Sequence, residues 1–217
     1  MMYRYTEDFL WYLRGMMQCL FIAKKYNIKR GYHHRKQVIN FDDTKNTDEW
    51  QDEVYLKAKE ISNTHGFQSI IDFGCGSGYK LIKYFNDFTT IGFELEPTLT
   101  FLQQKYNHKQ WKSFDEDARY NCDVLILSDV IEHLENPTET LQKLLNTINF
   151  NYIFISTPDR NLLKDRRKFG PPRNVSHFRE WTFQEFRDYL EDFFIIEDHM
   201  ISNEAQATQL IIGKKRK

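Results

Sequence analysis

Three glycines, Gly74, Gly76 and Gly78, stand at alternate positions directly after the apolar segment 70–73, and the acid Asp72 lies just ahead of them. Glycine lets the backbone turn tightly and approach a ligand closely. The helix expected next along the chain points its N-terminus at the same ligand. The pattern therefore predicts a binding site for a nucleotide-like cofactor.

Asp72 and the glycine spacing narrow the choice of cofactor. A dinucleotide site requires Gly-x-Gly-x-x-Gly, whereas here the third glycine comes one residue early and Tyr79 follows it. A carboxylate at Asp72 would repel a phosphate but attract cationic groups. S-adenosylmethionine carries an ammonium and a sulfonium and no phosphate. It is therefore the predicted cofactor, and Phe73 and Cys75 belong to the same predicted site.

A second acid, Glu94, ends the next apolar segment, which begins at residue 89. It lies about 20 residues beyond Gly74, the separation at which such folds place a carboxylate to bind a ribose diol. Glu96 competes for this role, but Glu94 directly terminates the apolar run. We therefore predict that Glu94 binds the ribose.

Two histidines are candidates for chemistry on the acceptor. His133 and the acid Asp129 follow the apolar segment 122–127, and His177 lies in a polar loop beyond the segment 151–156. A hydroxyl acceptor has a high pKa and needs a base or a metal, and histidine suits the base role near neutral pH. His177 is the predicted general base. His133 and Asp129 would share a face if their turn is helical, although His133 could equally be structural.

The elements that position these residues alternate between strand and helix from Asp48 onward, which predicts an α/β fold with a parallel sheet covered on both faces. Strands are expected at 70–73, 89–94, 110–113, 122–127, 151–156, 193–196 and 209–212. Helices are expected at 48–64, 79–85, 97–106, 137–146 and 182–190. In the last of these, Glu185 follows Thr182 by three residues, which is the pattern of a capping box.

Three segments together resemble the cofactor strands of class I S-adenosylmethionine-dependent methyltransferases. They are Ile71 to Gly78, Gly92 to Glu94 and Asp123 to Leu134. The resemblance covers roughly residues 48–214. It implies a Rossmann-like, seven-stranded, mostly parallel sheet with one antiparallel strand near the C-terminus. It also implies that Asp72 and the glycine turn hold the methionine end of the cofactor, that Glu94 holds the ribose, and that Asp115 or its neighbours hold the adenine.

The segments 155–160, 170–174 and 177–181 resemble methyltransferase domains associated with glycosyltransferases and polysaccharide synthesis. This resemblance implies O-methylation of a sugar hydroxyl in a glycan or an activated sugar, with a glycosyltransferase as a partner. The loop offers Arg160, Arg173 and Asn174 beside Tyr32 and Trp181, and such donors and aromatic faces suit a sugar.

The set Asp129, Glu132, His133 and His177 also resembles the metal-binding residues of small-RNA terminal-ribose methyltransferases. Carboxylate and imidazole ligands could hold magnesium or manganese. An RNA ribose 2'-O-methyltransferase is therefore the alternative enzyme. Because the Asp-Val-Ile-Glu-His-Leu pattern is widespread in methyltransferases that use no metal, no metal ligand is assigned.

Composition favours one soluble domain. The 217 residues include 30 basic and 31 acidic side chains, so no overall field marks the chain as a nucleic-acid binder. We expect a helical and basic extension over 1–47 and a methyltransferase domain over 48–217. A helix from Phe9 to Ala23 is too short to span a bilayer and could serve a partner, which leaves a non-catalytic, methyltransferase-like subunit as a third hypothesis.

The chain has three cysteines, Cys19, Cys75 and Cys122, without paired spacing. An odd and scattered set is typical of a reducing compartment. The expected location is therefore cytoplasmic.

Overall fold

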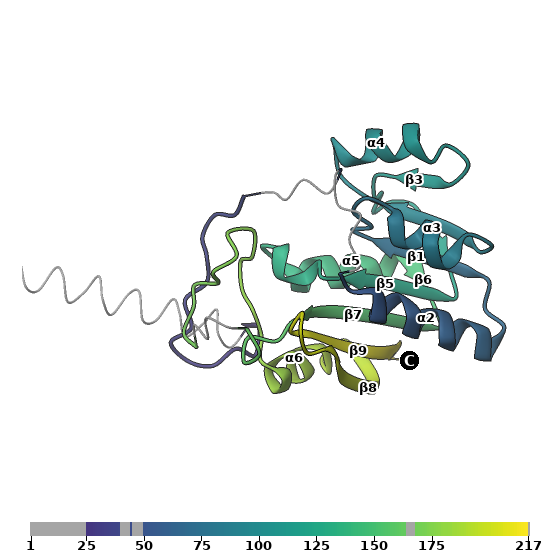
Figure 1. Ribbon diagram of the computed structural model, residues 1–217. Helices are drawn as coiled ribbons and strands as arrows, with labels where there is room; N and C mark the ends of the chain where they lie inside the picture. Colours follow the sequence, from purple (N-terminus) through teal and green to yellow (C-terminus); the bar gives the residue numbers. More distant parts are fainter. Residues whose placement is uncertain (1–24, 40–43, 45–49, 164–167, 217) are drawn as a thin grey trace, which may run out of the picture.

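The computed structural model describes residues 25–39, 44, 50–163 and 168–216. The centre of the molecule is a seven-stranded sheet with the strand order β3-β2-β1-β5-β7-β9-β8 (Figure 1). Its strands are β1 (Ser69–Phe73), β2 (Thr89–Phe93), β3 (Gln110–Lys112), β5 (Val124–Ser128), β7 (Tyr152–Pro158), β8 (Phe194–Asn203) and β9 (Thr208–Lys215). A separate small parallel pair joins β4 (Tyr120–Asn121) to β6 (Ile148–Asn149).

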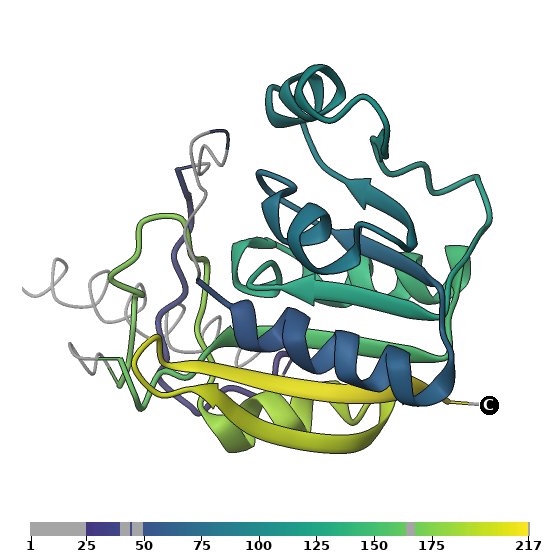
Figure 2. The same cartoon turned by 45° about the vertical axis from the view of Figure 1, so that its right-hand side comes forward.

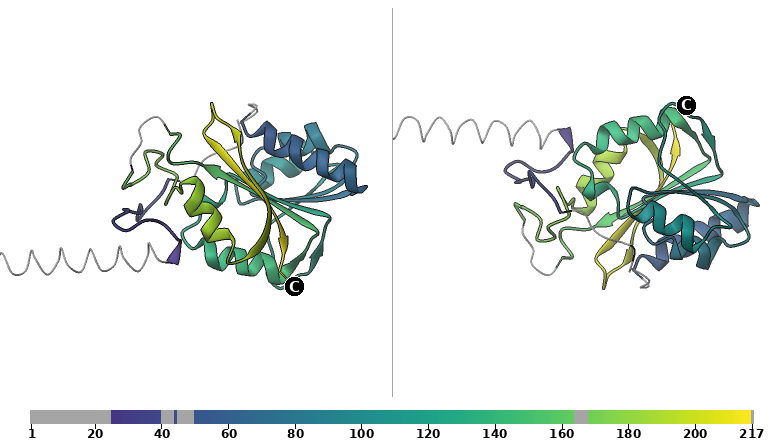
Figure 3. Two further views of the ribbon diagram at one scale, coloured as in Figure 1. Left: turned by 90° about the horizontal axis from the view of Figure 1, so that it is seen from below. Right: turned by 90° about the horizontal axis from the view of Figure 1, so that it is seen from above.

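Helices cover both faces of the sheet, as the two views of Figure 3 show. The described helices are α2 (Asp52–His65), α3 (Tyr79–Phe85), α4 (Thr98–Lys105), the 3-10 turn η2 (Ile131–His133), α5 (Pro137–Thr147) and α6 (Phe183–Leu190). One buried cluster joins the sheet to α2, α3 and α4, and a second joins it to α5 and α6. The sheet is thus enclosed, which explains why its central strands are mostly apolar.

The topology confirms the predicted α/β class. The neighbours β3, β2, β1, β5 and β7 pair in parallel, whereas β9 runs antiparallel to both β7 and β8. This is the expected seven-stranded, mostly parallel sheet with its antiparallel strand near the C-terminus. Because the carboxyl ends of parallel strands share one edge, the loops that follow β1, β2, β5 and β7 lie together.

Local signals account for the ends of several helices. Thr182 and Glu185 form the predicted capping box at the start of α6. Gly66 ends α2 in the left-handed conformation, which an L side chain adopts only with strain. Within the described residues, the sequence patterns did not predict the small pair β4 and β6 or the turn η2, because two- and three-residue elements leave too little periodicity to recognise.

Residues 25–39, here called the strap, lie beside the loop 168–178 at the edge where the parallel strands end (Figures 1 and 2). Backbone amides of His33, Arg35 and Ile39 donate to carbonyl oxygens of Phe169, Phe178 and Val175. The strap side chains Tyr26, Ile28 and Tyr32 are buried in the core cluster that includes α5 and α6. The expected helix from Phe9 to Ala23 lies outside the described residues.

Among the residues that the structure describes, no helix combines the length and apolar character needed to cross a membrane.

Candidate active site

The glycine turn lies between β1 and α3 and folds back on the end of β2. Backbone amides of Gly74 and Cys75 both donate to the carbonyl oxygen of Phe93, and the amide of Gly76 donates to Glu94 Oε2 at 2.8 Å. The structure therefore brings together the turn and the acid that was predicted to bind ribose.

Glycine is required at Gly74 for two reasons. Its φ of 76° lies in the left-handed region, and a Cβ there would stand 2.6 Å from Cγ2 of Val130. Val130 follows Asp129 in the loop after β5. The close approach of these two loops is possible only without a side chain at Gly74.

Asp72 is buried at the end of β1. Its Oδ2 accepts a hydrogen bond of 3.0 Å from the Tyr55 hydroxyl, whereas its buried Oδ1 has no partner among the described residues. Burial raises the pKa of Asp72 to about 7, and the bond from Tyr55 acts in the opposite direction. An unsatisfied carboxylate oxygen in this place fits a cationic ligand group.

Asp129 directly follows β5 and takes a left-handed φ of 52°. Its carboxylate accepts hydrogen bonds from Ser156 Oγ at 2.6 Å and from Gln51 Nε2 at 2.7 Å. Burial is the main cause that raises its pKa. The turn η2 begins only at Ile131, so Asp129 is not on a helix with His133, and the expected shared helical face does not form.

The adenine end of the predicted site is open. Asp115 is exposed in the loop after β3, where its Oδ1 accepts the amide of Asp117. Phe114 beside it packs edge-on against Phe73 and Phe93. Phe73 thus lies in an aromatic cluster that borders the cofactor turn.

His177 is buried, and both of its ring nitrogens are engaged. Nδ1 lies 2.8 Å from Glu180 Oε1, and Nε2 lies 2.9 Å from Asn174 Nδ2. The orientation of the Asn174 amide follows from its Oδ1, which accepts the amide of Ser176 at 3.0 Å. His177 therefore donates through Nδ1, and its Nε2 lone pair accepts a hydrogen bond from the Asn174 amide.

His133 has the same tautomer. Its Nδ1 donates to the carbonyl oxygen of Ser176 at 2.9 Å, and its ring meets that of His177 edge-on with centroids 4.7 Å apart. Burial, with a smaller contribution from His177, lowers the pKa of His133 to about 4. Because Nδ1 carries the proton that bonds to Ser176 and the pKa of the ring is low, Nε2 of His133 is unprotonated at neutral pH.

Glu132 completes a cluster with these two histidines. One ligand atom from each of Glu132, His133 and His177 lies within 4.8 Å of the others. Oε2 of Glu132 accepts from Thr157 at 2.9 Å, but its buried Oε1 has no partner within the described structure. Burial, followed by the charge of Asp129, raises the pKa of Glu132. The Nε2 of His133 and the unsatisfied oxygen of Glu132 fit a divalent cation, and the Nε2 of His177 would join them if the Asn174 amide moved away.

Several side chains that suggested sugar binding are instead structural. Tyr32 and Trp181 are fully buried, and Arg160 is buried in an ion pair with Glu185. Sequence patterns identified their polar or aromatic character, but only tertiary packing decides which way such groups face. Arg173 and Asn174 remain exposed in the loop.

The sequence did not predict three side chains that bond to candidate site residues: Gln51 to Asp129, Tyr55 to Asp72 and Glu180 to His177. The first two lie four residues apart at the start of α2, and Glu180 lies three residues after His177. Gln51 is the N-cap of α2 and Tyr55 lies in its first turn, and no sequence pattern links them to their acidic partners, which are distant in the chain.

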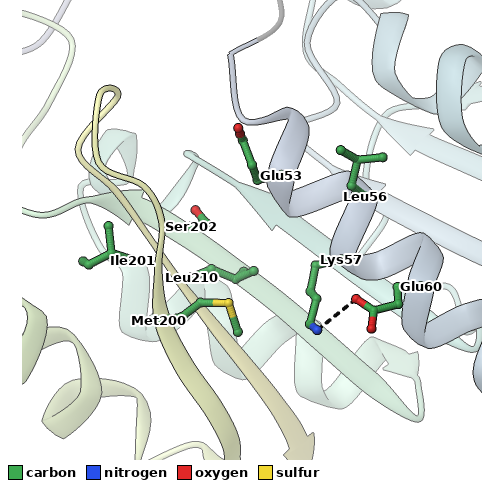
Figure 4. A pocket seen from close by; sticks show the side chains of 8 residues that line it. All are labelled: Glu53, Leu56, Lys57, Glu60, Met200, Ile201, Ser202 and Leu210. Atoms are coloured by element: carbon green, nitrogen blue, oxygen red, sulfur yellow. Dashed lines mark hydrogen bonds and ion pairs between the residues drawn. The ribbon is translucent and has the colours of Figure 1, made fainter.

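A groove of about 290 Å³ lies between α2 and the β8–β9 hairpin (Figure 4). Leu56, Met200 and Leu210 give it an apolar lining, and the ion pair of Lys57 with Glu60 stands at its side. None of the predicted site residues lines it, so it is separate from the cofactor and acceptor sites.

Comparisons with solved structures agree with this fold. Small RNA methyltransferase HEN1 superposes with a TM-score of 0.60 at 19% identity, over 84% of this chain and 27% of that chain. A 1,6-didemethyltoxoflavin-N1-methyltransferase of Burkholderia thailandensis, solved with S-adenosylhomocysteine, gives 0.58 at 18% identity, over 78% and 82% of the two chains. The plantazolicin methyltransferase BpumL, also with S-adenosylhomocysteine, gives 0.54 at 17% identity, over 76% and 82%.

No curated protein matches the chain. A family model described as a methyltransferase domain matches residues 37–207, which include the glycine turn, Glu94, Asp129 and His177. The chain therefore belongs to this family of methyltransferase domains and is an S-adenosylmethionine-dependent methyltransferase with the class I fold.

Proposed function

We propose that this enzyme methylates the oxygen of a sugar hydroxyl, with His177 as the general base. The observation that carries the proposal is the hydrogen bonding of His177. His177 Nδ1 donates to Glu180 Oε1, with 2.8 Å between the two atoms. His177 Nε2 accepts from Asn174 Nδ2, which lies 2.9 Å away. An acceptor hydroxyl that replaces the Asn174 amide would meet a base in the correct tautomer.

The chemistry explains why such a base favours oxygen over nitrogen. A neutral amine can attack a methyl group before it loses a proton, whereas a hydroxyl needs help because its pKa is high. S-adenosylmethionine supplies the methyl group on a sulfonium. The hydroxyl proton passes to His177 Nε2 as the new oxygen–carbon bond forms and the sulfur–carbon bond breaks. Glu180 stabilises the resulting imidazolium.

Two observations support a sugar as the acceptor. The segments 155–160, 170–174 and 177–181 resemble those of glycan methyltransferases, and exposed Arg173 and Asn174 offer donors beside His177. A glycan or activated sugar, with a glycosyltransferase as the partner, is the substrate class that we propose.

An acceptor panel tests the proposal. The enzyme is incubated with labelled S-adenosylmethionine and with free sugars, nucleotide sugars, oligosaccharides, RNA and heterocyclic amines in parallel. Label on a sugar oxygen is the expected result. Transfer only to the amines would contradict O-methylation. Transfer only to RNA would contradict a glycan acceptor and support a ribose hydroxyl as the acceptor.

The metal-fitting cluster favours a second candidate, methylation of a ribose hydroxyl at an RNA terminus. Glu132, His133 and His177 would hold a divalent cation, and such an ion can bind both oxygens of a vicinal diol and make one hydroxyl more acidic. HEN1, whose fold is similar, is a small RNA methyltransferase. In this case His177 would be a ligand rather than a base.

A chelator separates the two candidates. With the best acceptor from the panel, turnover that survives excess chelator supports His177 as a base. Turnover that falls and returns on addition of Mn²⁺ or Mg²⁺ supports the metal. Binding to RNA that weakens steeply with salt would further favour the second candidate.

A further inference from the structure

Two polar side chains at the start of α2 hold acids from two different strands. Tyr55 donates its hydroxyl proton to Asp72 Oδ2 at 3.0 Å, and Gln51 donates its side-chain amide to Asp129 Oδ2 at 2.7 Å. Asp72 ends β1 and Asp129 follows β5, and these strands are neighbours in the sheet. Gln51 is the N-cap of α2 and Tyr55 lies in its first turn, so one end of a single helix contacts both acids.

The N-terminal end of α2 is itself fixed by the β8–β9 hairpin. The backbone amide of Gln51 donates to Gln206 Oε1 at 2.8 Å, and Asn203 Nδ2 donates to Glu53 Oε1 at 2.8 Å. Figure 2 shows α2 crossing the sheet beside this hairpin. The position of the Tyr55 hydroxyl is therefore determined by packing rather than by the bond to Asp72.

The surroundings of Asp72 make this one hydrogen bond important. Lys80, on the first turn of α3, favours the carboxylate, whereas Glu94 beyond β2 opposes it. Burial and Asp72 raise the pKa of the Tyr55 hydroxyl, and the charges of Cys75 and Asp129 add to this effect. Burial works against ionisation of Asp72, and Tyr55 supplies its only hydrogen-bond donor among the described residues. A cationic ligand group needs the ionised form.

We propose that Tyr55 is a positioning residue which favours the ionised form of Asp72, so that docking of α2 and the ambient pH together set the affinity for S-adenosylmethionine. The cofactor ammonium would meet the unpartnered Oδ1 while Tyr55 holds Oδ2. The inference depends on the cofactor and not on the acceptor, and it extends the proposed function to the control of cofactor binding.

Calorimetric titration with S-adenosylmethionine tests the inference. Dissociation constants are measured from about pH 5.5 to about pH 7, where an α-amino group with an ordinary pKa of about 7.7 to 8.0 is mostly protonated. Wild-type affinity should rise with pH over this range. The Tyr55→Phe variant should bind about threefold to tenfold more weakly near pH 6.5, and its rise should move to higher pH, because a charge-assisted hydrogen bond has been lost.

Tyr84→Phe is the matched control. Tyr84 stacks on Tyr55 from α3 with ring centroids 6.4 Å apart, so its hydroxyl is removed from the same helix pair without a change at Asp72. It should leave the pH profile unchanged. A Tyr55→Phe profile that is uniformly weaker without a shift in pH, or that coincides with wild type, would overturn the inference.

Asp72→Asn supplies an independent check. Either loss of binding or a flat pH profile supports the inference, and a wild-type pH profile in Asp72→Asn refutes it. Circular dichroism and thermal unfolding confirm that each variant is folded. Wild-type affinity independent of pH would overturn this inference alone, whereas an acceptor panel without methylated sugar would overturn only the proposed substrate.

Discussion

The cofactor turn is built mostly from neighbouring residues, whereas the acceptor site is assembled from distant ones. Backbone amides of the turn between β1 and α3 donate to Phe93 and Glu94, two consecutive residues at the end of β2. His177, by contrast, lies in a loop that the strap contacts through three backbone hydrogen bonds and that η2 contacts through the carbonyl of Glu132. A short motif can therefore identify the methyl donor, while the acceptor depends on contacts between remote parts of the chain.

The largest effect expected from breaking the acceptor side alone is a loss of transfer in His177→Gln. Turnover should fall by about 10²- to 10⁴-fold, because a general base contributes that much. The affinity for S-adenosylmethionine should stay at the wild-type value. Turnover assays and calorimetry on the same preparation measure both quantities.

His65→Gln is the control for that substitution. His65 ends α2 and stacks on Phe67, far along the chain from the acceptor loop. Its turnover should match wild type. Equal turnover in His177→Gln and wild type would remove His177 from the chemistry.

On the cofactor side, Asp72→Asn should stabilise the protein that lacks cofactor. Burial raises the pKa of Asp72 from 3.8 to about 7, so the folded state binds more protons than the unfolded state between these values. Ionisation of Asp72 therefore reduces the stability as the pH rises through this window, and the cost is complete above pH 7. An asparagine avoids it, with an expected gain of about 2 to 4 kcal/mol at high pH.

Thermal unfolding at two pH values measures this gain. The melting temperature of Asp72→Asn should exceed that of wild type by several degrees near neutral to alkaline pH and approach it below the ordinary pKa of an aspartate. A difference that is equally large at both pH values would indicate a packing effect instead.

Gly74→Ala tests the contact between the cofactor turn and the loop after β5, which carries Asp129 and Val130. A Cβ at Gly74 would stand 2.6 Å from Val130, so the substitution should push apart the cofactor turn and the loop that carries Asp129. We expect a loss of about 2 to 4 kcal/mol in stability, together with weaker cofactor binding, from the combined backbone strain and overpacking.

Gly66→Ala separates those two causes. Gly66 has a similar φ of 70°, but nothing lies within 4 Å of an added Cβ. It should lose only about 1 to 2 kcal/mol, from the left-handed backbone. Equal losses in chemical denaturation of the two variants would mean that the approach of Gly74 to Val130 has no energetic weight.

A last prediction sharpens the metal alternative. If Glu132, His133 and His177 hold a cation, Mn²⁺ at about a hundred times its dissociation constant should stabilise the protein by about 2.7 kcal/mol. His133→Ala should abolish this shift. A wild-type melting temperature that does not respond to Mn²⁺, or a shift that survives in His133→Ala, would argue against the site.

The same contrast explains what could be predicted from the sequence. The succession of strands and helices and the glycine turn follow from hydrophobic periodicity and a local motif, whereas the seven-stranded sheet with one antiparallel strand was implied by the family resemblance, and the structure confirms both. The pairing of Tyr55 with Asp72 could not be predicted, because it depends on how α2 packs across the sheet. The burial of Arg160 and Trp181 was missed for the same reason, since a polar or aromatic residue in a loop carries no sign of which way it faces.

The strap also determines where the chain can be shortened. The family model begins at residue 37, yet the core already contains Tyr26, Ile28 and Tyr32, and the Tyr32 hydroxyl accepts the amide of Glu180 at 3.0 Å. Cutting the chain at the family boundary would uncover Trp181 and remove a support of the partner of His177. Recombinant fragments intended for acceptor screening should therefore keep residue 25 onward, because a fragment that begins at 37 could retain the donor pocket and still give misleadingly negative screens.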